Sequence, residues 1–517
     1  MSKQDNPLVL LAASAIAAGV AIAGLIFFGI IPNNLVQEKD KSPSSNPSAQ
    51  AQLKILADTF SGYSTFRHRE FRQDLAKRGI DLGYEDEFDQ AKRARRLGQD
   101  AQLIATTLDQ FLQQEPDGKI IALIDRTVGA DAAVLNTVEY PNLKSLEDLR
   151  QLVRQKGDRK LSIAFAGDTP SEYLANVLDT RFEAFDLADF NIISVADAED
   201  AWKLLSGGDK DVAIAVIWEP FVTRARQQGY TVVLSSEDAP KAILDVIVAA
   251  NDFLAKQPEE VSEFLESYYR RIQSSVGDSS KLQAQIARDG RLSKEDAAAV
   301  LAGIKFFTAL EAYQWMTDGT LEKRIASTAA VLALAGRISR PPDNTASLYA
   351  PQAIEVASEN IQALIESVRK DNPELAKILS GELKPVTAKS RPSEQEVKDA
   401  PAIGNLKVRG EVKFEAGSAD IALEGIATLN KLATEIREFN PNTIAVKAIG
   451  HTSKSGAAKY NQILSERRAQ AVVKYLQSLG LSQKLVAEGK GFSSPLSGIS
   501  PQDPRQQRTE IRLVRIN

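Results

Sequence analysis

Arg468 is the residue near the C-terminus whose position most clearly requires a chemical partner. It lies four residues after Leu464 and four before Val472, so its guanidinium shares a helical stripe with apolar side chains. An arginine on such a stripe is costly to bury unless a carboxylate meets it. That carboxylate can belong to the fold, with Glu510 or Asp420 in an internal ion pair, or to a bound ligand. The sequence leaves both interpretations open.

A second group of polar residues lies in loops that follow short apolar runs and precede helical patterns. Because backbone N–H groups are free at the start of a helix, and the positive end of its dipole faces the same loop, such loops bind anionic or polar groups. Asp125, Asp131 and Glu219 add carboxylates there, which favours a polar or cationic ligand over a free oxyanion. The residues that we predict to bind a small molecule are Ser61, Tyr63, Thr107, Asp131, Thr169, Ser171, Trp218 and Glu219.

Some of these residues also have a purely structural explanation. Thr169 fits a helix N-cap, Pro170 fits the first helical position, and Glu172 fits the matching position of a capping box. Since a helix that caps itself needs no ligand, capping and ligand contact both stay open for Thr169 and Ser171. Trp218 can stack on a ligand or fill a hinge.

Residue counts exclude most catalytic, metal and nucleic-acid chemistry. The chain has no cysteine, so disulfides, thiolate metal sites and a cysteine nucleophile are excluded. Its two histidines, His68 and His451, are too few for a histidine metal centre or a triad. We therefore predict no enzyme activity, no catalytic residues, no metal and no cofactor. The 63 basic and 68 acidic residues are mixed along the sequence and give no basic field for nucleic acid.

Residues 8–31 form an uncharged run of 24 residues near the N-terminus. As a helix with a rise of ~1.5 Å per residue, this run exceeds the ~30 Å hydrocarbon thickness of a bilayer. A cleaved signal peptide is the alternative, but the run is long for that role and residues 32–35 offer no small-x-small cleavage site. We predict a transmembrane helix at 8–31, preceded by a cytoplasmic tail at 1–7.

Two polar stretches, 32–52 and 381–404, are rich in Ser, Pro and Lys and are predicted to be linkers, because they cannot bury apolar surface. Between them, in the domain predicted at 53–380, short apolar runs alternate with charged amphipathic segments. This pattern is typical of βα units on a largely parallel sheet. From about Asn251 onward it becomes mostly helical, with Tyr268-Tyr269 expected in the core.

The last predicted domain, 405–517, has a different pattern. Amphipathic helices are predicted at 421–439 and 460–479, and strands with alternating apolar residues at 411–414, 443–449 and 510–514. These elements indicate a small α+β domain.

The segment GHTSKSGAAKYNQILSERRAQAVVKYL, from Gly450, is similar to the motif of the OmpA-like family, and GKGF and QQRTEIRL follow it at the family's spacing. The resemblance implies noncovalent binding of the diaminopimelate of peptidoglycan between a carboxylate and an arginine. Carried over, the binding residues are Ser453, Asn461, Arg468 and Arg508. Where the family has GHTD this chain has GHTS, so Ser453 replaces a charged acceptor, and peptidoglycan binding is expected to be weaker or altered. Arg508 is equally well explained as a charge at a strand edge.

The middle domain resembles the periplasmic substrate-binding proteins of nitrate, sulfonate and taurine uptake. The resemblance rests on IDRTVGADAAV from Ile124, AFAGDTPSEYLANVL from Ala164 and DVAIAVIWEPFVTRARQQGY from Asp211. It implies two α/β lobes that close on a small ligand, joined by crossovers near 140–146 and 239–248. An ABC permease is a possible partner.

The predicted fold class is therefore a two-lobed α/β binding-protein-like domain plus a small α+β OmpA-like domain, with one N-terminal transmembrane helix. We expect a solute-binding protein in the inner membrane, single-pass, with its soluble domains in the periplasm and attached to peptidoglycan. The alternative is a structural envelope tether whose receptor-like domain is a ligand-free spacer. A stator-like proton channel is excluded, because 8–31 contains no ionisable residue.

Overall fold

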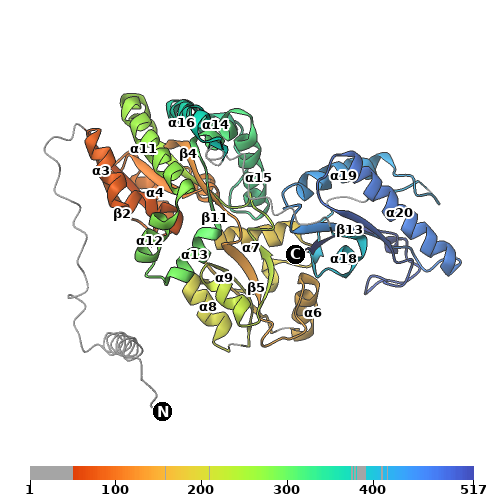
Figure 1. Cartoon of the computed structure of the whole chain (residues 1–517). Coiled ribbons are helices and arrows are strands. Elements are labelled where there is room, and N and C mark those ends of the chain that lie inside the picture. Colours follow the sequence, from red (N-terminus) through yellow and green to blue (C-terminus); the bar gives the residue numbers. More distant parts are fainter. Residues whose placement is uncertain are drawn as a thin grey trace, which may run out of the picture. The chain divides into compact units, whose positions relative to one another are not determined.

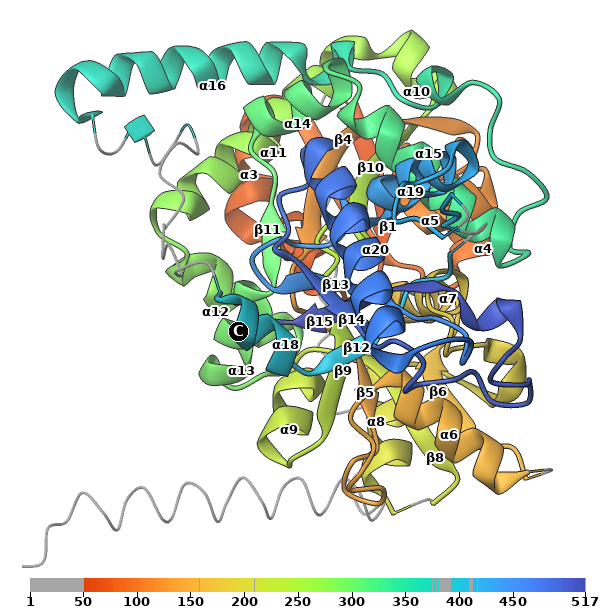
Figure 2. The same cartoon turned by 90° about the vertical axis from the view of Figure 1, so that its right-hand side faces the viewer.

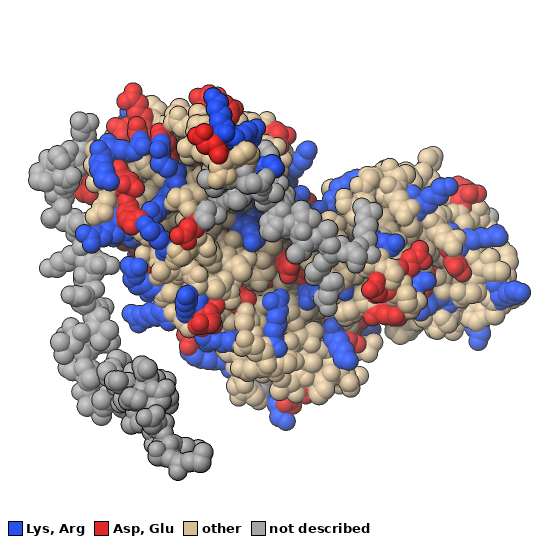
Figure 3. Space-filling view, viewed as in Figure 1, with Lys and Arg blue, Asp and Glu red and all other residues tan. Residues whose placement is uncertain are grey.

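The computed structural model describes residues 51–516 except 158, 209, 374, 375, 378, 379, 381–391, 409–411 and 416. The predicted tail, the predicted transmembrane helix and all but the last two residues of the first predicted linker lie outside the described residues. Within the described part, no helix has the length and apolar character needed to cross a membrane. Basic and acidic side chains alternate over the face shown in Figure 3, as the mixed charge pattern of the sequence predicted.

The first lobe is built on a six-stranded sheet in the order β11-β4-β10-β3-β1-β2, of which β2, β4 and β11 are labelled in Figure 1. Strand β1 runs parallel to β2 and β3, whereas β10 runs antiparallel to β3 and β4. Its central strands are buried on both faces because helices cover them, and their residues are accordingly Leu, Ile, Val and Ala. The strands are β1 (Ala51–Ala57), β2 (Ile80–Asp86), β3 (Leu103–Thr107), β4 (Gly118–Thr127), β10 (Leu244–Ala250) and β11 (Ile304–Phe306).

Two sets of helices pack on this sheet, and the second forms the mostly helical part predicted from Asn251 onward. The first set is η2 (Ser61–Tyr63), α2 (Ser64–Arg67), α3 (Arg69–Lys77), α4 (Gln90–Arg96) and α5 (Leu108–Gln114). The second set is α10 (Asn251–Lys256), α11 (Pro258–Gly277), α12 (Ser280–Asp289), α13 (Lys294–Ala302), α14 (Ala309–Thr317), α15 (Thr320–Leu334), η4 (Thr345–Leu348) and α16 (Gln352–Asp371).

The second lobe has a five-stranded sheet in the order β7-β6-β8-β5-β9. Strand β6 is parallel to β7 and β8, while β5 is antiparallel to β8 and β9. Its strands are β5 (Asp131–Leu135), β6 (Ser162–Ala166), β7 (Asn191–Val195), β8 (Val212–Trp218) and β9 (Thr231–Ser235). Its helices are α6 (Leu146–Lys156), α7 (Pro170–Arg181), η3 (Leu187–Asp189), α8 (Ala198–Ser206) and α9 (Phe221–Gln227). The two-lobed α/β architecture that the sequence predicted is thus confirmed.

The chain crosses between the lobes at two places, and one differs from the prediction. The first crossing is Val128-Gly129-Ala130, because β4 belongs to the first sheet and β5 to the second. The predicted position, 140–146, is wrong, since it lies within the second lobe and leads into α6. The turn is possible because Gly129 has a φ of 101°, which residues with a side chain rarely adopt. The second crossing, between β9 and β10, agrees with the prediction.

The C-terminal domain has a four-stranded sheet in the order β12-β15-β13-β14. Figure 2 shows α20 lying along β13 and β14, which it contacts. The elements are α18 (Glu394–Asp399), β12 (Ala402–Asn405), α19 (Leu423–Ile436), β13 (Ile444–Gly450), α20 (Ala458–Ser478), β14 (Leu485–Gly489), η5 (Pro504–Gln506) and β15 (Thr509–Arg515). The predicted strand at 411–414 reduces, in its described part, to an isolated bridge between Phe414 and Ile421.

Part of the second predicted linker is regular structure. Helix α18 begins with a capping box in which Ser393 accepts from the backbone of Glu396 and the Glu396 side chain accepts from the backbone of Ser393. Strand β12 pairs with β15, so the C-terminal domain includes residues that we predicted to be linker. The error arose because this stretch contains Ser and Pro and few apolar residues, so it resembles a linker. One of those few, Val397, is buried.

Backbone hydrogen bonds join the end of α7 to the residues around the end of β12. The amide of Glu183 donates to the carbonyl of Asn405 at 3.0 Å, and that of Lys407 donates to the carbonyl of Arg181 at 2.7 Å. Phe182 lies between them and packs edge-on against Phe439, with ring centroids 6.2 Å apart.

Candidate functional sites

Two aspartates face each other at the hinge, on neighbouring strands of the first lobe. The register of β4 and β10 places Asp125 directly opposite Asp245, and both side chains are buried. Burial raises the pKa of both carboxyl groups well above their ordinary value, and each raises the pKa of the other. Neither oxygen of Asp125 has a hydrogen-bond partner, and Asp245 has one oxygen without a partner. We call Asp125 and Asp245 the hinge dyad.

Aromatic residues from two helices surround the dyad. The hydroxyl of Tyr63, in η2, donates to Oδ1 of Asp245 at 2.5 Å. Tyr268, in α11, is fully buried and its hydroxyl has no partner, while burial and then Tyr269, Asp125 and Asp245 raise its pKa. The prediction that Tyr268 and Tyr269 are buried is confirmed, but nothing in the sequence indicates that Tyr268 lies near carboxylates.

Gly62 lets the first helical loop approach the dyad closely. A Cβ at this position would lie 2.3 Å from Oδ2 of Asp125 and 2.5 Å from the ring of Phe60. Because no side chain fits there, the backbone of η2 can lie directly against the carboxylate.

The second lobe contributes further buried carboxylates. Burial raises the pKa of Asp131, at the start of β5, to about 7; the Thr127 hydroxyl opposes this shift, and the nearby Glu219 and Asp109 add to it. Asp131 lies opposite Trp218 in the pairing of β5 with β8. The carboxylate of Glu219 accepts from the backbone N–H and the hydroxyl of Thr223, at 3.0 and 2.9 Å.

The loop after β3 supplies another acid from the first lobe. Asp109 lies in the first turn of α5, where a negative charge is favoured by the helix dipole, and it accepts from Nε2 of Gln110 at 3.1 Å. Burial nevertheless raises its pKa to about 6. Thr107 ends β3 just before it and is buried, and its side chain makes no cap hydrogen bond.

The loop after β6 is largely satisfied by its own contacts. Oγ1 of Thr169 accepts from the backbone of Ser171 at 3.2 Å and donates to the carbonyl of Ala166 at 2.7 Å. The Glu172 side chain accepts from the backbone of Asp168, not of Thr169, so the capping box is shifted by one residue. Thr169 therefore acts as a cap. Its neighbour Ser171 is fully buried and its hydroxyl has no partner, and Ser61 is half-buried in η2.

The nearest arginines are paired with other groups. Arg93 is buried and donates to Oδ2 of Asp58 at 2.8 Å and to two backbone carbonyls. Arg126, next to Asp125 in sequence, points to Glu311 at 2.9 Å and stacks on Phe307. Neither arginine forms an ion pair with the hinge dyad.

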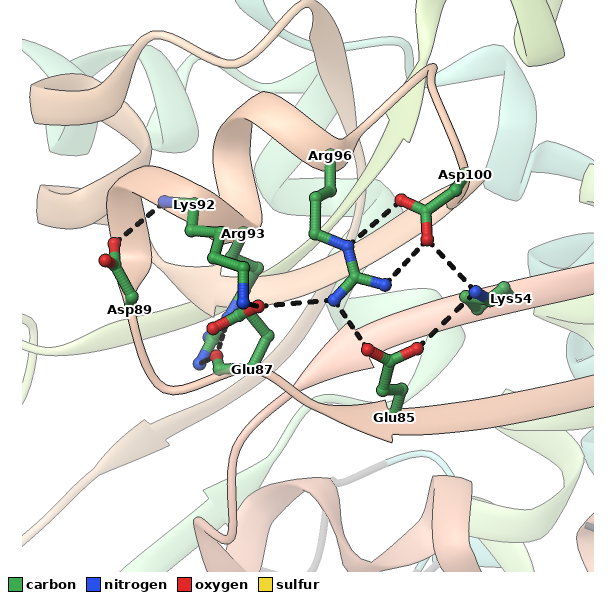
Figure 4. A network of polar contacts seen from close by, with 8 residues as sticks. All are labelled: Lys54, Glu85, Glu87, Asp89, Lys92, Arg93, Arg96 and Asp100. Atoms are coloured by element: carbon green, nitrogen blue, oxygen red, sulfur yellow. Dashed lines mark hydrogen bonds and ion pairs between the residues drawn. The ribbon is translucent and has the colours of Figure 1, made fainter.

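Figure 4 shows a charge network on the same lobe in which cations and carboxylates match. Arg96 pairs with Glu85, Glu87 and Asp100, and Lys54 bridges Glu85 and Asp100. The pKa of Glu85 is lowered as a result, first by its hydrogen bond with Arg96. Glu85, Glu87 and Asp100 thus each have a cationic partner, which the hinge dyad does not have within the described residues.

Two hollows in the described surface lie away from the dyad. One, beside α3 and α11, contains Arg78 and Arg271, but these cations pair with Glu263 and Glu70. The other contains Arg324, which pairs with Glu438. The carboxylates that line these hollows, Asp74 and Glu438, have cationic partners, unlike those at the hinge.

In the C-terminal domain, Arg468 lies on the buried side of α20 and has no carboxylate partner among the described residues. Its Nε donates to the carbonyl of Ser418 at 3.0 Å, its Nη1 donates to Oε1 of Gln507 at 3.1 Å, and its guanidinium lies 4.9 Å from the centre of the Phe414 ring. Burial lowers its pKa. The internal ion pair with Glu510 or Asp420 that we considered is not formed.

Glu510 instead neutralises other cations. It accepts two hydrogen bonds from Arg508, at 2.9 and 2.6 Å, and lies 3.1 Å from Arg512 and 3.2 Å from Nε2 of His451. Burial alone would raise the pKa of Glu510, but His451 and Arg508 lower it to about 2. The described contacts of Arg508 are therefore internal.

Ser453 and Asn461 lie in the loop between β13 and α20 and at the start of that helix. Ser453 is buried, and the backbone of the preceding Thr452 donates to the carbonyl of Gly491 at 2.8 Å. Nδ2 of Asn461 donates to the carbonyl of Ser455 at 2.7 Å. Asn461 thus holds the shape of the loop.

Comparison with known proteins identifies the C-terminal domain. Residues 413–509 match the OmpA family, which confirms the resemblance predicted from the motif. Outer membrane protein A of Shigella flexneri is 34% identical over 132 residues, which are 25% of this chain and 36% of that protein. The protein of the same name from Atlantibacter hermannii is 37% identical over 95 residues, 18% of this chain and 39% of that protein. The chain thus spans between about a quarter and a half of the length of the curated relatives it matches.

Solved structures resemble the two-lobed part. A putative periplasmic sulfonate-binding protein from Methylobacillus flagellatus covers 60% of this chain and 94% of its own, with 14% identity and a TM-score of 0.46. The periplasmic nitrate-binding protein of Synechocystis PCC 6803 covers 60% and 89%, with 12% identity and a TM-score of 0.46. The desulfurization enzyme DSZB also covers 60% and 99%, with 11% identity and a TM-score of 0.42. The chain joins a domain of the OmpA family to a domain of two α/β lobes.

Proposed function

We propose that this chain is a solute-binding protein of the cell envelope that is held on peptidoglycan by its C-terminal domain. The observation that carries the attachment is Arg468, a buried guanidinium that the described part of the fold leaves without a carboxylate. Its contacts with Ser418, Gln507 and Phe414 fix its orientation but do not neutralise its charge. A stem-peptide carboxylate would supply the missing charge-assisted hydrogen bonds.

Ser453 weakens this binding site. A hydroxyl accepts a hydrogen bond from an ammonium group but carries no charge, and charge-assisted bonds are about twice as strong as neutral ones. The chain should therefore bind the carboxylate of diaminopimelate through Arg468 more firmly than its ammonium group.

The middle domain is the proposed solute receptor. Its two lobes are joined by two crossings, and buried polar residues from both lobes gather where they meet. The proposal includes anchoring by the apolar run 8–31 in the inner membrane, soluble domains in the periplasm, and an ABC permease as partner.

Attachment is tested by sedimentation of the full chain with purified peptidoglycan. Wild type should bind weakly, Arg468→Ala should lose binding, and Ser453→Asp should gain it. Arg467→Ala is the matched control, because Arg467 is the neighbouring arginine on the same helix and is exposed. Equal sedimentation of all four proteins would refute the proposed site.

Solute binding is tested by the melting temperature of the full chain in the presence of small solutes, since a ligand that binds only the folded state raises it. The alternative, a structural tether with a ligand-free spacer, predicts that no solute raises the melting temperature while peptidoglycan binding is intact.

A further inference from the structure

Buried carboxylates in the described part of the chain fall into two groups. Glu87 and Asp238 are paired with Lys or Arg side chains. The other buried carboxylates have no Lys or Arg partner within the described residues, and all lie where the lobes meet; they are Asp109, Asp125, Asp131, Glu219 and Asp245. Buried acidic groups are normally paired inside the fold, so five without a Lys or Arg partner along one hinge require a cause.

The hinge dyad is the part of this group with the fewest internal contacts. Both oxygens of Asp125 and one oxygen of Asp245 lack a hydrogen-bond partner. The hydroxyl of Tyr268, from a different element, is equally buried and lacks a partner as well. A proton shared between the two carboxyl groups would satisfy one contact and leave the others unmade. Buried polar groups without partners are rare in folded proteins, so these atoms point to a bound group.

A series of aromatic rings begins beside the dyad at Tyr63, whose ring centre lies 6.4 Å from that of Phe66. The ring of Phe60 packs edge-on against Tyr63, with centroids 5.2 Å apart, and Phe66 stacks on Tyr268 at 5.3 Å. Tyr268 in turn packs edge-on against Tyr269 at 5.1 Å. Carboxylates beside aromatic faces are the chemistry that recognises an organic ammonium group.

We propose that the hinge of the two-lobed domain binds an organic cation, with Asp125 and Asp245 as its counter-charges and the rings of Tyr63 and Tyr268 beside it. The inference rests on the proposed solute-binding function and names the class of solute. An anion would meet acidic groups from both lobes, and Arg93 and Arg126, which lie near the dyad, are paired with Asp58 and Glu311. A metal ion is disfavoured because the described residues contain no group of three or more His, Cys, Asp or Glu placed to hold one.

The same charges connect ligand binding to the position of the lobes. Asp125 and Asp245 belong to the first lobe, whereas Asp131 and Glu219 belong to the second. If these carboxyl groups ionise, their like charges on the two sides of the hinge oppose closure, and a cation between them removes that opposition. The ligand should therefore favour the closed arrangement.

The test is isothermal titration calorimetry of the full chain with two sets of probes. The cations are ethylammonium, putrescine, agmatine and choline; the others are propanol, ethanesulfonate, nitrate and Mg²⁺. At least one organic cation should bind with a Kd below about 1 mM. Asp125→Asn and Asp245→Asn should each weaken that binding about tenfold or more, because each removes a buried counter-charge. Asp252→Asn is the control, since Asp252 is an exposed residue of α10 paired with Lys256.

The possible outcomes distinguish a failure of the organic-cation inference from a failure of the proposed solute-binding function. If ethanesulfonate, nitrate or propanol binds and no organic cation does, the receptor function stands and the inference is wrong. If only Mg²⁺ binds, or if both dyad variants bind the cation as wild type does, the inference is also wrong. If no probe binds, both fail. Circular dichroism melting of each variant verifies that it is folded. If one of the two dyad variants does not fold, the other still tests the inference.

Discussion

The two candidate sites leave unpaired charges of opposite sign. At the hinge, buried carboxylates have no cation, whereas in the C-terminal domain the buried Arg468 has no carboxylate. Each region also contains a paired counterpart: Arg93 with Asp58 near the hinge, and Arg508 with Glu510 on β15. The difference teaches that the type of a charged residue does not identify a site. A site is indicated where the fold leaves the charge without its partner.

The largest expected effect that tests this contrast is a pH dependence of stability. Asp131 has a pKa of about 7 in the fold and about 3.8 when unfolded, so the native state binds more protons between these values. Stability must then fall as pH rises through this window, by about 1.4 kcal/mol per pH unit and up to about 4 kcal/mol in all. Asp109, with a pKa of about 6, acts in the same direction.

Urea unfolding of wild type and Asp131→Asn at pH 5 and pH 8 checks this expectation. Wild type should lose more stability than the variant between the two pH values. Glu510, whose pKa is about 2, is ionised throughout the window from pH 5 to pH 8 and so does not contribute to this loss of stability. Equal losses in both proteins would mean that Asp131 is not an unpaired buried acid.

The paired side of the comparison is tested by Asp58→Asn. Arg93, whose side chain is 1% exposed, would keep its backbone acceptors but lose the one carboxylate that it contacts among the described residues. Removing one partner of a buried ion pair typically costs about 3 kcal/mol or more. Chemical denaturation measures the loss, with Asp343→Asn, from an exposed pair with Arg340, as a control that should change little. A loss at Asp58 as small as the control's would remove the distinction between paired and unpaired groups.

Much of the fold follows from the sequence, because continuous apolar runs such as those of β4, β6 and β8 are typical of buried strands. Strand β2, with the sequence IDLGYED, was not predicted, since three of its seven residues are acidic. Strand β5 was not separated from β4, because only the turn at Gly129 divides them.

The candidate sites were predictable where one helix or loop positions a residue, and not where the register of distant strands does. The stripe of α20 placed Arg468 correctly, because helical spacing alone determines it. Asp245 lies 120 residues after Asp125, and nothing in the sequence specifies that β10 pairs with β4 in that register. Tyr268 has a helical core pattern that conceals its position beside the dyad.

A third prediction contrasts two arginines of the C-terminal domain: Arg508, which pairs with Glu510, and Arg468, which has no carboxylate partner among the described residues. Arg508→Ala removes two hydrogen bonds to Oε1 of the half-buried Glu510 and should destabilise the domain by about 2 kcal/mol. Arg468→Ala removes a charge that nothing neutralises and should cost less stability, yet lose peptidoglycan binding. Thermal unfolding and peptidoglycan sedimentation of both variants measure the two effects. If the variant that loses more stability also loses more peptidoglycan binding, the loss of binding follows from destabilisation, and Arg468 is a structural residue.

The smallest effect concerns the hinge dyad without ligand. In Asp125→Asn an amide of nearly the same shape replaces the carboxyl group and directs an N–H donor toward the oxygen of Asp245 that has no partner. One new buried hydrogen bond is worth about 1 kcal/mol, so the variant should melt slightly above wild type while binding an organic cation more weakly. A gain in stability with a loss of binding is expected when a site is kept unsatisfied for its ligand. A variant that melts clearly below wild type would instead mean that the acid at position 125 stabilises the fold, and the hinge would then belong with the paired groups of Figure 4.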